Sequence, residues 1–409
     1  MTVLAHRIRL DINNVQRTWF ERCAGTARFA WNRGLARWNE MHAAGEKPSW
    51  QEINAELNAC KAEKFPWMLD LPWAIPNKAL SDLGSAFQHF FRRVREKNRK
   101  PGRPRFKKRG RCNEGFAVEG RALVFSGKTL RIPKIGSIRL REALRFPGKV
   151  LSARFTKRAE HWYVSAQVEI DSSWIYPHAC KTHAACGIDL GVRDLAVLST
   201  GERIEAPRSL RRYEAKLRRL NKELARRTKG GKNRQKTKMK LAKLHERIAN
   251  IRRDVTHKLT TDLVSRFRVI GIEDLNVSGM ARSGLAKSVM DAAMAEVSRE
   301  LTYKAPLAGS TVVVADRWFP SSKTCSVCGT INKSLTLRER RWTCGACESE
   351  HDRDQNAAEN LKKLATAFVV TARCQRSSDD PCKRTVKLPF GREAGSHCVN
   401  RDHDGSSPA

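Results

Sequence analysis

The sequence lacks any run of about 18 consecutive apolar residues, the length that a membrane-spanning helix requires. It also lacks an apolar signal-peptide segment behind its basic start, so we expect neither secretion nor a membrane partner. Acidic residues are scarce: 42 Asp and Glu stand against 79 Lys and Arg, a formal net charge of +37. Such an excess strains a compact fold unless a polyanion neutralises it, and nucleic acid is the polyanion to expect.

Regularly spaced cysteines are few. Of 12 cysteines only four form a pattern, Cys325/Cys328 and Cys344/Cys347, with fifteen residues between the two Cys-x-x-Cys pairs. This is the spacing of a four-thiolate zinc ribbon, and the glycines that follow Cys328 and Cys344 suit tight thiolate turns. The remaining cysteines are scattered, which indicates a reducing compartment. We expect a structural Zn²⁺ site in a cytoplasmic protein.

The N-terminal part of the chain predicts helices flanked by strands. With 409 residues the chain has room for roughly two to four domains. Alternation over residues 2–11 predicts a strand, and apolar residues at helical spacing predict helices over 15–45 and 77–97. We assign residues 15–103 to a helical domain. The segment 98–111, rich in Lys, Arg and Pro, predicts a basic loop between domains.

Short alternating segments between residues 112 and 171, ending in a hairpin at 159–160, predict a small β-barrel or sheet. The first strand is expected to join it, because it would otherwise be unpaired. We therefore assign residues 1–14 and 104–180 to a β-barrel domain.

The C-terminal half predicts an α/β domain over residues 181–318. It has apolar strands at 186–190, 267–275 and 311–316 and a helix over 286–305. Residues 207–262 are basic and helical, broken by a Gly-rich turn at 229–232, which predicts a helical hairpin. The remaining assignments are a zinc ribbon at 319–350, a final helix at 351–370 and a disordered tail at 371–409, where apolar periodicity is lost.

Three acidic residues lie in or beside apolar segments, where a carboxylate is costly to desolvate unless it is paired or bound to a metal. Asp189 lies in an apolar strand, Glu273 ends another, and Asp354 lies in the first turn of the final helix. Three oxygen donors suit Mg²⁺, and two such ions about 3.5–4 Å apart catalyse phosphodiester hydrolysis. Each acid alone also fits a turn, cap or solvated strand end, and Asp352 is the better helix cap. The three together favour a metal site.

Histidines give no comparable signal. His351 and His257 are isolated, and we interpret both as surface or packing residues rather than ligands.

Several motifs together resemble one known family. The segments GIDLGVRDLAV, VIGIEDL, FPSSKTCSVCG, RRWTCGAC and HDRDQNAAENL, in this order, are similar to TnpB, the nuclease family of certain bacterial insertion sequences. The resemblance covers about residues 5–365, and the joint occurrence of these motifs is highly specific. The family is related to type V CRISPR effectors.

The resemblance implies a multidomain α+β fold with a helical recognition lobe, a β-barrel wedge domain and an RNase H-like (RuvC) α/β nuclease domain with an inserted zinc ribbon. It implies an endonuclease that uses a transposon-derived guide RNA (the ωRNA) and a transposon-adjacent motif to cut double-stranded DNA. The catalytic acids that bind two Mg²⁺ ions would be Asp189, Glu273 and Asp354. The Zn²⁺ ligands would be Cys325, Cys328, Cys344 and Cys347.

The resemblance also implies nucleic-acid contacts and a setting. Asn77 and Lys78 are candidates for reading the adjacent motif where wedge and recognition helices meet. The basic-loop candidates for contact with nucleic acid are Arg103, Arg105, Lys107 and Lys108. We expect one protomer on one guide RNA, bound to DNA in the bacterial cytoplasm at the nucleoid.

Two other functions stay open. A nuclease-inactive, RNA-guided regulator or accessory transposition factor would share the charge and the ribbon but would not cut. A DD[E/D] transposase would share the RNase H-like fold, although a zinc ribbon before the third acid disfavours it. The presence of all three acids favours the nuclease, because inactive relatives lose one or more of them.

Overall fold

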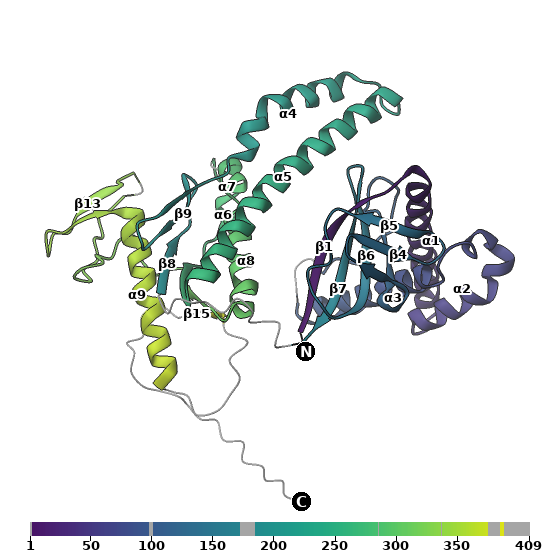
Figure 1. The fold of residues 1–409 in the computed structure, drawn as a ribbon, viewed down its shortest axis with the longest axis horizontal. Coiled ribbons are helices and arrows are strands. Elements are labelled where there is room, and N and C mark those ends of the chain that lie inside the picture. The colour runs from purple at the N-terminus through teal and green to yellow at the C-terminus, as the bar shows by residue number, and fades with distance from the viewer. Residues whose placement is uncertain are drawn as a thin grey trace, which may run out of the picture. The chain divides into compact units, whose positions relative to one another are not determined.

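The computed structural model describes residues 2–97, 101–171, 185–284, 286–336, 338–374 and 385–387. The chain forms two compact units: Met1–Ile175 with Lys222–Glu246, and Tyr176–Asn221 with Arg247–Ala409 (Figure 1). Throughout the described residues, every helix is too short or too polar to cross a membrane.

The first unit contains a seven-stranded sheet of order β2-β6-β7-β1-β5-β4-β3. The N-terminal strand joins this sheet, as predicted: β1 runs antiparallel to β7 from Thr2 to Arg9 and then pairs with β5. The predicted hairpin is also present, with Arg158 of β6 opposite His161 of β7. The strands are β1 Thr2–Asp11, β2 Gly115–Glu119, β3 Val124–Ser126, β4 Thr129–Ile132, β5 Gly136–Leu140, β6 Lys149–Arg158 and β7 His161–Ile170.

The predicted closed barrel is wrong. In the described part of the chain β2 and β3 are edge strands that do not pair with each other, so the sheet is open. A helix completes the core instead. Phe20 of α1 packs edge-on against Phe116, Phe155 and Trp162 of the sheet, with ring centroids 5.4, 5.3 and 5.1 Å away. Because α1 covers these side chains, the sheet does not need to close on itself to bury them.

The helices of the first unit are α1 Asn14–Ala43, α2 Trp50–Lys64 and α3 Ala74–Arg95, with 3₁₀ turns at Pro66–Met68 and Gly120–Ala122. Asn13 begins α1 with a capping box, in which its side chain accepts from the Gln16 amide at 2.8 Å. Trp38 of α1 stacks on Phe87 of α3 at 4.2 Å. Helices and sheet share one hydrophobic core.

The second unit is built on a six-stranded sheet of order β10-β9-β8-β11-β12-β15. Its strands are β8 Ala185–Asp189, β9 Asp194–Leu198, β10 Arg203–Glu205, β11 Val269–Glu273, β12 Thr311–Ala315 and β15 Thr385–Lys387. Neighbours among β8, β11, β12 and β15 are parallel, whereas β9 and β10 are antiparallel. The carboxyl ends of β8, β11 and β12 therefore lie at one edge. The sheet packs with its helices around a second core.

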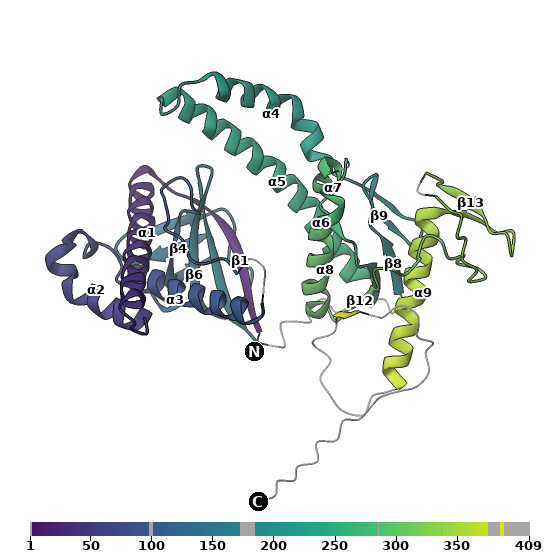
Figure 2. The same cartoon turned by 180° about the vertical axis from the view of Figure 1, so that it is seen from behind.

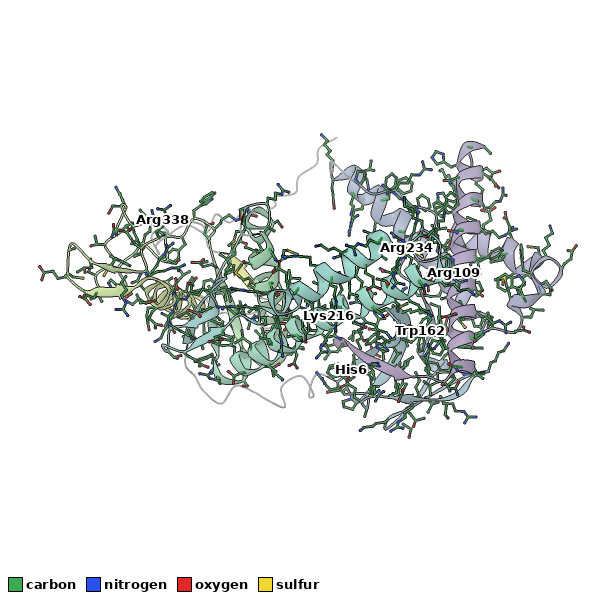
Figure 3. The ribbon with its side chains drawn as sticks, turned by 90° about the horizontal axis from the view of Figure 1, so that it is seen from above. His6, Arg109, Trp162, Lys216, Arg234 and Arg338 are labelled. Atoms are coloured by element: carbon green, nitrogen blue, oxygen red, sulfur yellow. The ribbon has the colours of Figure 1, made fainter. Side chains whose placement is uncertain are left out.

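The remaining helices are α4 Ser209–Arg226, α5 Lys232–Arg266, α6 Val277–Met280, α7 Ala286–Ala292, α8 Met294–Leu307 and α9 Arg353–Cys374. The predicted basic hairpin is present as α4 and α5, joined through the Gly-rich turn; Figure 3 labels Lys216 on α4 and Arg234 on α5. The predicted single helix over 286–305 is wrong. It is interrupted at Ala293, whose left-handed φ of 60° breaks the helical hydrogen bonding between α7 and α8.

Part of the predicted disordered tail has regular structure. Helix α9 continues to Cys374, and Thr385–Lys387 pairs in parallel with β12. Prediction of disorder is therefore wrong for these described residues, because the edge of β12 offers backbone groups that a further strand can pair. The rest of that tail lies outside the described residues.

Candidate functional site

Two glycines determine how closely α9 lies against the sheet. Gly187 of β8 and Gly271 of β11 are register partners in neighbouring parallel strands. A Cβ atom at Gly187 would lie 1.9 Å from the Ala358 carbonyl oxygen, and one at Gly271 would lie 2.3 Å from that of Leu361. Both distances are far below van der Waals contact. Glycine at these positions therefore lets the backbone of α9 lie directly on the strands (Figure 2).

This packing brings the three predicted acids together. Asp189 and Glu273 each stand two residues after one of the glycines, so they project on the same face of the sheet, the face that α9 covers. On α9, Asp354 precedes Ala358 by four residues and shares its side of the helix. The charges of Glu273 and Asp354 both act on Asp189. The acids thus gather at the carboxyl edge of β8 and β11.

Burial and mutual repulsion make this group unusual electrostatically. Desolvation, followed by the charges of Glu273 and Asp354, raises the pKa of Asp189 to about 8. Burial also raises the pKa of Glu273, although a hydrogen bond from the Ser321 hydroxyl to its Oε1 and the charge of Arg353 oppose this. Carboxylates that are desolvated and repel one another favour a bound proton or a bound cation.

The two acidic residues at the start of α9, Asp352 and Asp354, have different roles. Asp352 caps the helix, as predicted: the Gln355 amide donates to its Oδ1 at 3.0 Å, and Arg203 Nη2 lies 2.7 Å from the same oxygen. Asp354 is left free of capping. Its carboxylate accepts hydrogen bonds from Arg340 Nη1 at 3.1 and 3.4 Å.

The predicted ribbon cysteines form a compact cluster. The sulfur atoms of Cys325, Cys328, Cys344 and Cys347 all lie within 4.8 Å of one another. Among the described residues this is the only group of three or more His, Cys, Asp or Glu ligand atoms that close together, so the three carboxylates are spread more widely. The amides of Val327 and Cys328 point at Cys325 Sγ, at 3.4 and 3.5 Å, as in a thiolate turn.

Two short strands complete the ribbon, β13 Arg341–Thr343 and β14 Glu350–Asp352. Their pairing sets Trp342 opposite His351 and turns the histidine inward. His351 is a packing residue, as predicted, but it packs against the cluster itself, with Nε2 3.1 Å from Cys325 Sγ. His257, by contrast, lies on α5 with its Nδ1 3.2 Å from the buried carboxylate of Glu300.

Two asparagines that the sequence analysis missed join the ribbon to α9. Asn356 accepts from the Ser326 amide at 2.8 Å and donates to the Thr324 carbonyl at 2.7 Å. Asn360, one turn later, donates to the Thr324 and Ser321 carbonyls at 2.6 and 2.8 Å. Their spacing of four residues, on a helix face that is otherwise apolar, was the sequence signal that could have indicated them. Through them the cysteine cluster is held in a defined place relative to Asp354.

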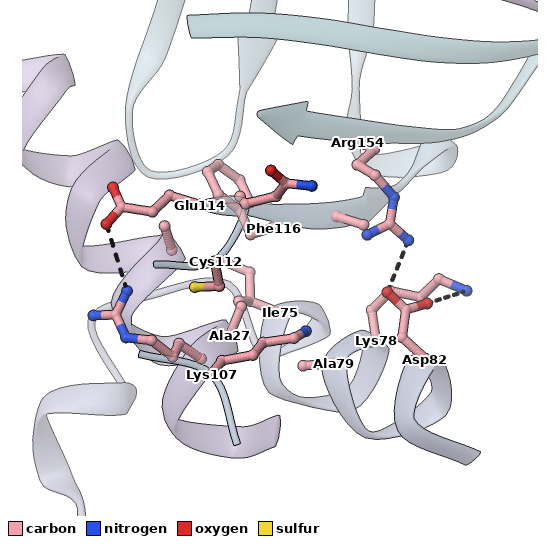
Figure 4. A pocket seen from close by; sticks show the side chains of 15 residues that line it. Ala27, Ile75, Lys78, Ala79, Asp82, Lys107, Cys112, Glu114, Phe116 and Arg154 are labelled. Atoms are coloured by element: carbon pink, nitrogen blue, oxygen red, sulfur yellow. Dashed lines mark hydrogen bonds and ion pairs between the residues drawn. The ribbon is translucent and has the colours of Figure 1, made fainter. Parts of the chain in front are cut away.

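Two predicted nucleic-acid residues line a pocket of the first unit. Lys78 and Lys107 lie between α1, α3 and β2 (Figure 4). Lys78 Nζ is 3.7 Å from Asp82, whose other oxygen binds Arg154 at 2.8 Å. Lys107 Nζ lies 3.5 Å from the ring centre of Trp31, and burial lowers its pKa although Asp82 opposes this. The Lys78 amine therefore faces Asp82 at the rim of the pocket, whereas the Lys107 amine is held over the Trp31 ring.

The other residues predicted to contact nucleic acid do not line this pocket. Asn77 is partly exposed beside Lys78 on α3, and Arg103, Arg105 and Lys108 are exposed.

The described part of the basic loop is anchored on α1. Asn32 exchanges two hydrogen bonds with the Lys107 backbone, at 2.9 and 2.7 Å, and Trp31 Nε1 donates to the Arg105 carbonyl at 3.0 Å. Arg103 donates to Asn39 at 2.9 Å. These contacts hold the backbone of the loop against α1 at Arg105 and Lys107, and fix the side chain of Arg103.

Fold and site together define a strongly basic, two-unit α+β protein with a cluster of four cysteines that could hold a metal, beside a group of partly buried acids. Three family models match it: an OrfB/IS605 model described as "Probable transposase" over residues 164–284, a "Cas12f1-like, TNB domain" over 295–361, and an OrfB/IS605 "Helix-turn-helix domain" over 1–47. The described part of that last region is one strand and one long helix.

Curated relatives match nearly the whole chain. A Streptomyces pristinaespiralis protein named "Putative RNA-guided DNA endonuclease" is 34% identical, over 94% of this chain and 95% of the relative. InsQ of Escherichia coli strain K12, named in the same way, is 34% identical over 90% and 93%. This chain therefore belongs to the OrfB-like TnpB family, as its motifs indicate. A solved Cas12f1–sgRNA–target DNA complex is 13% identical with a TM-score of 0.33, which is too low to bear on the fold.

Proposed function

We propose that this protein is an RNA-guided DNA endonuclease that cuts double-stranded DNA by metal-dependent phosphodiester hydrolysis. The observation that carries the proposal is the meeting of Asp189, Glu273 and Asp354 at one sheet edge, in a chain whose relatives over nearly its full length are named as such endonucleases. A regulator that only binds DNA would have no need for three carboxylates in a partly buried, mutually repelling arrangement.

The acid group fits Mg²⁺. Its donors are hard carboxylate oxygens, and the raised pKa values of Asp189 and Glu273 support a site in which negative charge lacks full compensation. Bound Mg²⁺ would supply activation of a water nucleophile and stabilisation of the leaving oxygen. Ser321 orients Glu273 through its hydroxyl, and Arg340 holds the carboxylate of Asp354.

The four cysteines fit Zn²⁺ in a structural role. Four protein thiolates fill a tetrahedral site and leave no position for water, so this site would not take part in hydrolysis. Its contribution is to hold the ribbon, and with it Arg340, beside α9.

We assign the basic surface to nucleic acid. The α4–α5 hairpin would follow the backbone of the guide RNA or of its duplex with DNA, whose sequence is read by base pairing. Asn77 and Lys78 would read the transposon-adjacent motif, and Arg103, Arg105, Lys107 and Lys108 would contact nucleic acid nearby. The setting would be the bacterial cytoplasm at the nucleoid, with one protomer on one RNA.

The proposed domains follow the same assignment. They are a wedge domain at 1–14 and 104–180, a recognition domain at 15–103, a RuvC-like nuclease domain at 181–318, the ribbon at 319–350 and the last nuclease helix at 351–370.

The test begins with the RNA that copurifies with the full chain. Its sequence defines a guide, and a plasmid library with a matching target and randomised flanks then reports cleavage in Mg²⁺. We expect cutting by the wild type, none by Asp189→Ala, and equal RNA content in both. Guided binding without cutting by the wild type would instead establish the nuclease-inactive regulator.

A further inference from the structure

An exposed tryptophan emerges beside the acid group. Trp318 is 76% exposed, the highest value among the large apolar side chains of the described residues. It follows β12, which runs parallel to β11 with Ala315 opposite Glu273. The chain after Ala315 therefore leaves the sheet at the same edge at which the acids lie.

The turn that carries Trp318 is fastened to the acid-bearing end of β11 on both sides. Before it, Arg317 Nη2 lies 3.2 Å from Asp274 Oδ2, next to Glu273. After it, the buried Ser321 donates its hydroxyl to Glu273.

The turn is also fixed internally. The Trp318 amide donates to Asp316 Oδ1 at 2.9 Å, and the Phe319 amide donates to the Asp316 carbonyl at 3.0 Å. The backbone of Trp318 is thus held in place while its ring remains in solvent.

An indole held in water forgoes the free energy that burial would provide. Unpaired nucleobases are the ligands that suit such a ring, because each base has a flat π face and can stack on it regardless of sequence. The net charge of +37 favours a polyanion as the binding partner over an apolar protein surface.

We propose that Trp318 is a stacking platform for an unpaired base of the DNA strand that enters the acid group. This proposal rests on the proposed function and adds a positioning residue to it. Since the turn contacts Glu273 directly, a base stacked on Trp318 is held at a fixed place relative to that carboxylate. Trp318 would thereby position the phosphodiester without taking part in the chemistry.

The first test reads contact without cleavage. The full chain with its copurified RNA is irradiated, in buffer without Mg²⁺, with a 12-mer oligo-dT that contains one 4-thiothymidine. Trypsin then releases Trp318–Lys323 as one peptide. We expect the adduct on this peptide in the wild type and in Trp318→Phe, and its loss in Trp318→Ala. Tyr303→Ala is the matched control, since Tyr303 is an exposed aromatic residue of the same unit, 41% exposed on α8.

The second test reads cleavage. With guide-matched DNA we expect Trp318→Ala to cut about tenfold more slowly, the typical loss for one base–aromatic stack, with Trp318→Phe close to wild type. Trp318→Leu keeps an apolar side chain but removes the aromatic ring, so it separates stacking from apolar contact. We expect this variant to cut as slowly as Trp318→Ala. Zinc content and melting temperature should be unchanged in all variants.

The outcomes are separable. If Trp318→Ala crosslinks and cuts like the wild type, or if leucine rescues as well as phenylalanine, the platform is refuted while the endonuclease stands. If the wild type does not cut guided DNA, the proposed function fails, and the crosslink still decides whether Trp318 contacts a base.

Discussion

Gly187 of β8 and Gly271 of β11 are register partners in parallel strands, and the backbone of α9 lies directly over both. This relationship places Asp354 of α9 beside the acids that follow each glycine. Side-chain volume at two positions of the sheet thus controls the geometry of the whole acid group.

We therefore expect Gly271→Ala to disable the site from a position that carries no chemistry. Its Cβ would lie 2.3 Å from the Leu361 carbonyl, so α9 must shift. Overpacking of this kind costs about 1–3 kcal/mol of stability, and a shift of Asp354 should lower cleavage far more than the melting temperature suggests. Gly284→Ala is the control, because nothing lies within 4 Å of the Cβ it would add. Equal cleavage by both variants would contradict the role given to the glycine pair.

The raised pKa of Asp189 predicts an unusual pH dependence of stability for the Mg²⁺-free protein. Asp189 has a pKa of about 8 in the fold, against 3.8 ordinarily, so the folded chain holds a proton that the unfolded chain releases. Stability from this group is therefore lost as pH rises from about 4 to about 8. Asp189→Asn removes the effect, and its melting temperature should exceed that of the wild type by a margin that grows up to about pH 8. The scans omit chelators so that the ribbon keeps its metal.

Asp352→Asn is a control of opposite sign. Burial raises the pKa of Asp352, but hydrogen bonds from the Gln355 amide and Arg203 outweigh this and lower it. Its stabilisation is present above its ordinary pKa and is lost as pH falls, so this variant should be less stable than the wild type at neutral pH. A melting difference for Asp189→Asn that stays flat with pH would refute the electrostatic description.

Loss of the ribbon metal should abolish cleavage without unfolding the first unit. Cys344 is buried in the small core of the ribbon, which is distinct from the core of the first unit. Cys344→Ala should release the metal, and with it the contacts that hold Arg340 near Asp354. Metal content by mass spectrometry, thermal melting and cleavage with excess Mg²⁺ check this. Cys60→Ala, a partly buried cysteine outside the ribbon, should keep the metal and the activity.

The root of the basic hairpin depends on a buried acid. Asp291 caps α4 from a neighbouring helix: it accepts from Ser209 Oγ at 2.9 Å, the Leu210 amide at 2.8 Å and the Arg211 amide at 3.2 Å. Asp291→Ala should destabilise the start of α4 by about 1–2 kcal/mol and reduce the copurified RNA. Hydrogen exchange of α4 amides measures the first effect. Asp254→Ala, which removes only an exposed ion pair with Lys258, should change neither.

Local patterns in the sequence were sufficient for much of the fold. The long apolar period of α1 and the Gly-rich break between α4 and α5 are local signals, and the structure contains each of those elements. Helix α2 was not predicted, because only Ile53 and Leu57 are buried along it and its apolar period is weak. The barrel failed for a non-local reason: α1 covers the aromatic face that further strands would have covered.

The site divides in the same way. Sequence by itself determined the thiolate cluster, because Cys-x-x-Cys spacing brings each pair together within one turn, and it singled out the three acids by their place in apolar segments. Only the tertiary structure decided how those acids meet. Their closeness depends on the packing of α9 against Gly187 of β8 and Gly271 of β11, and these three elements are far apart in the sequence. The same holds for the exposure of Trp318. Whether a side chain is covered depends on every element packed around it, and no local pattern contains that information.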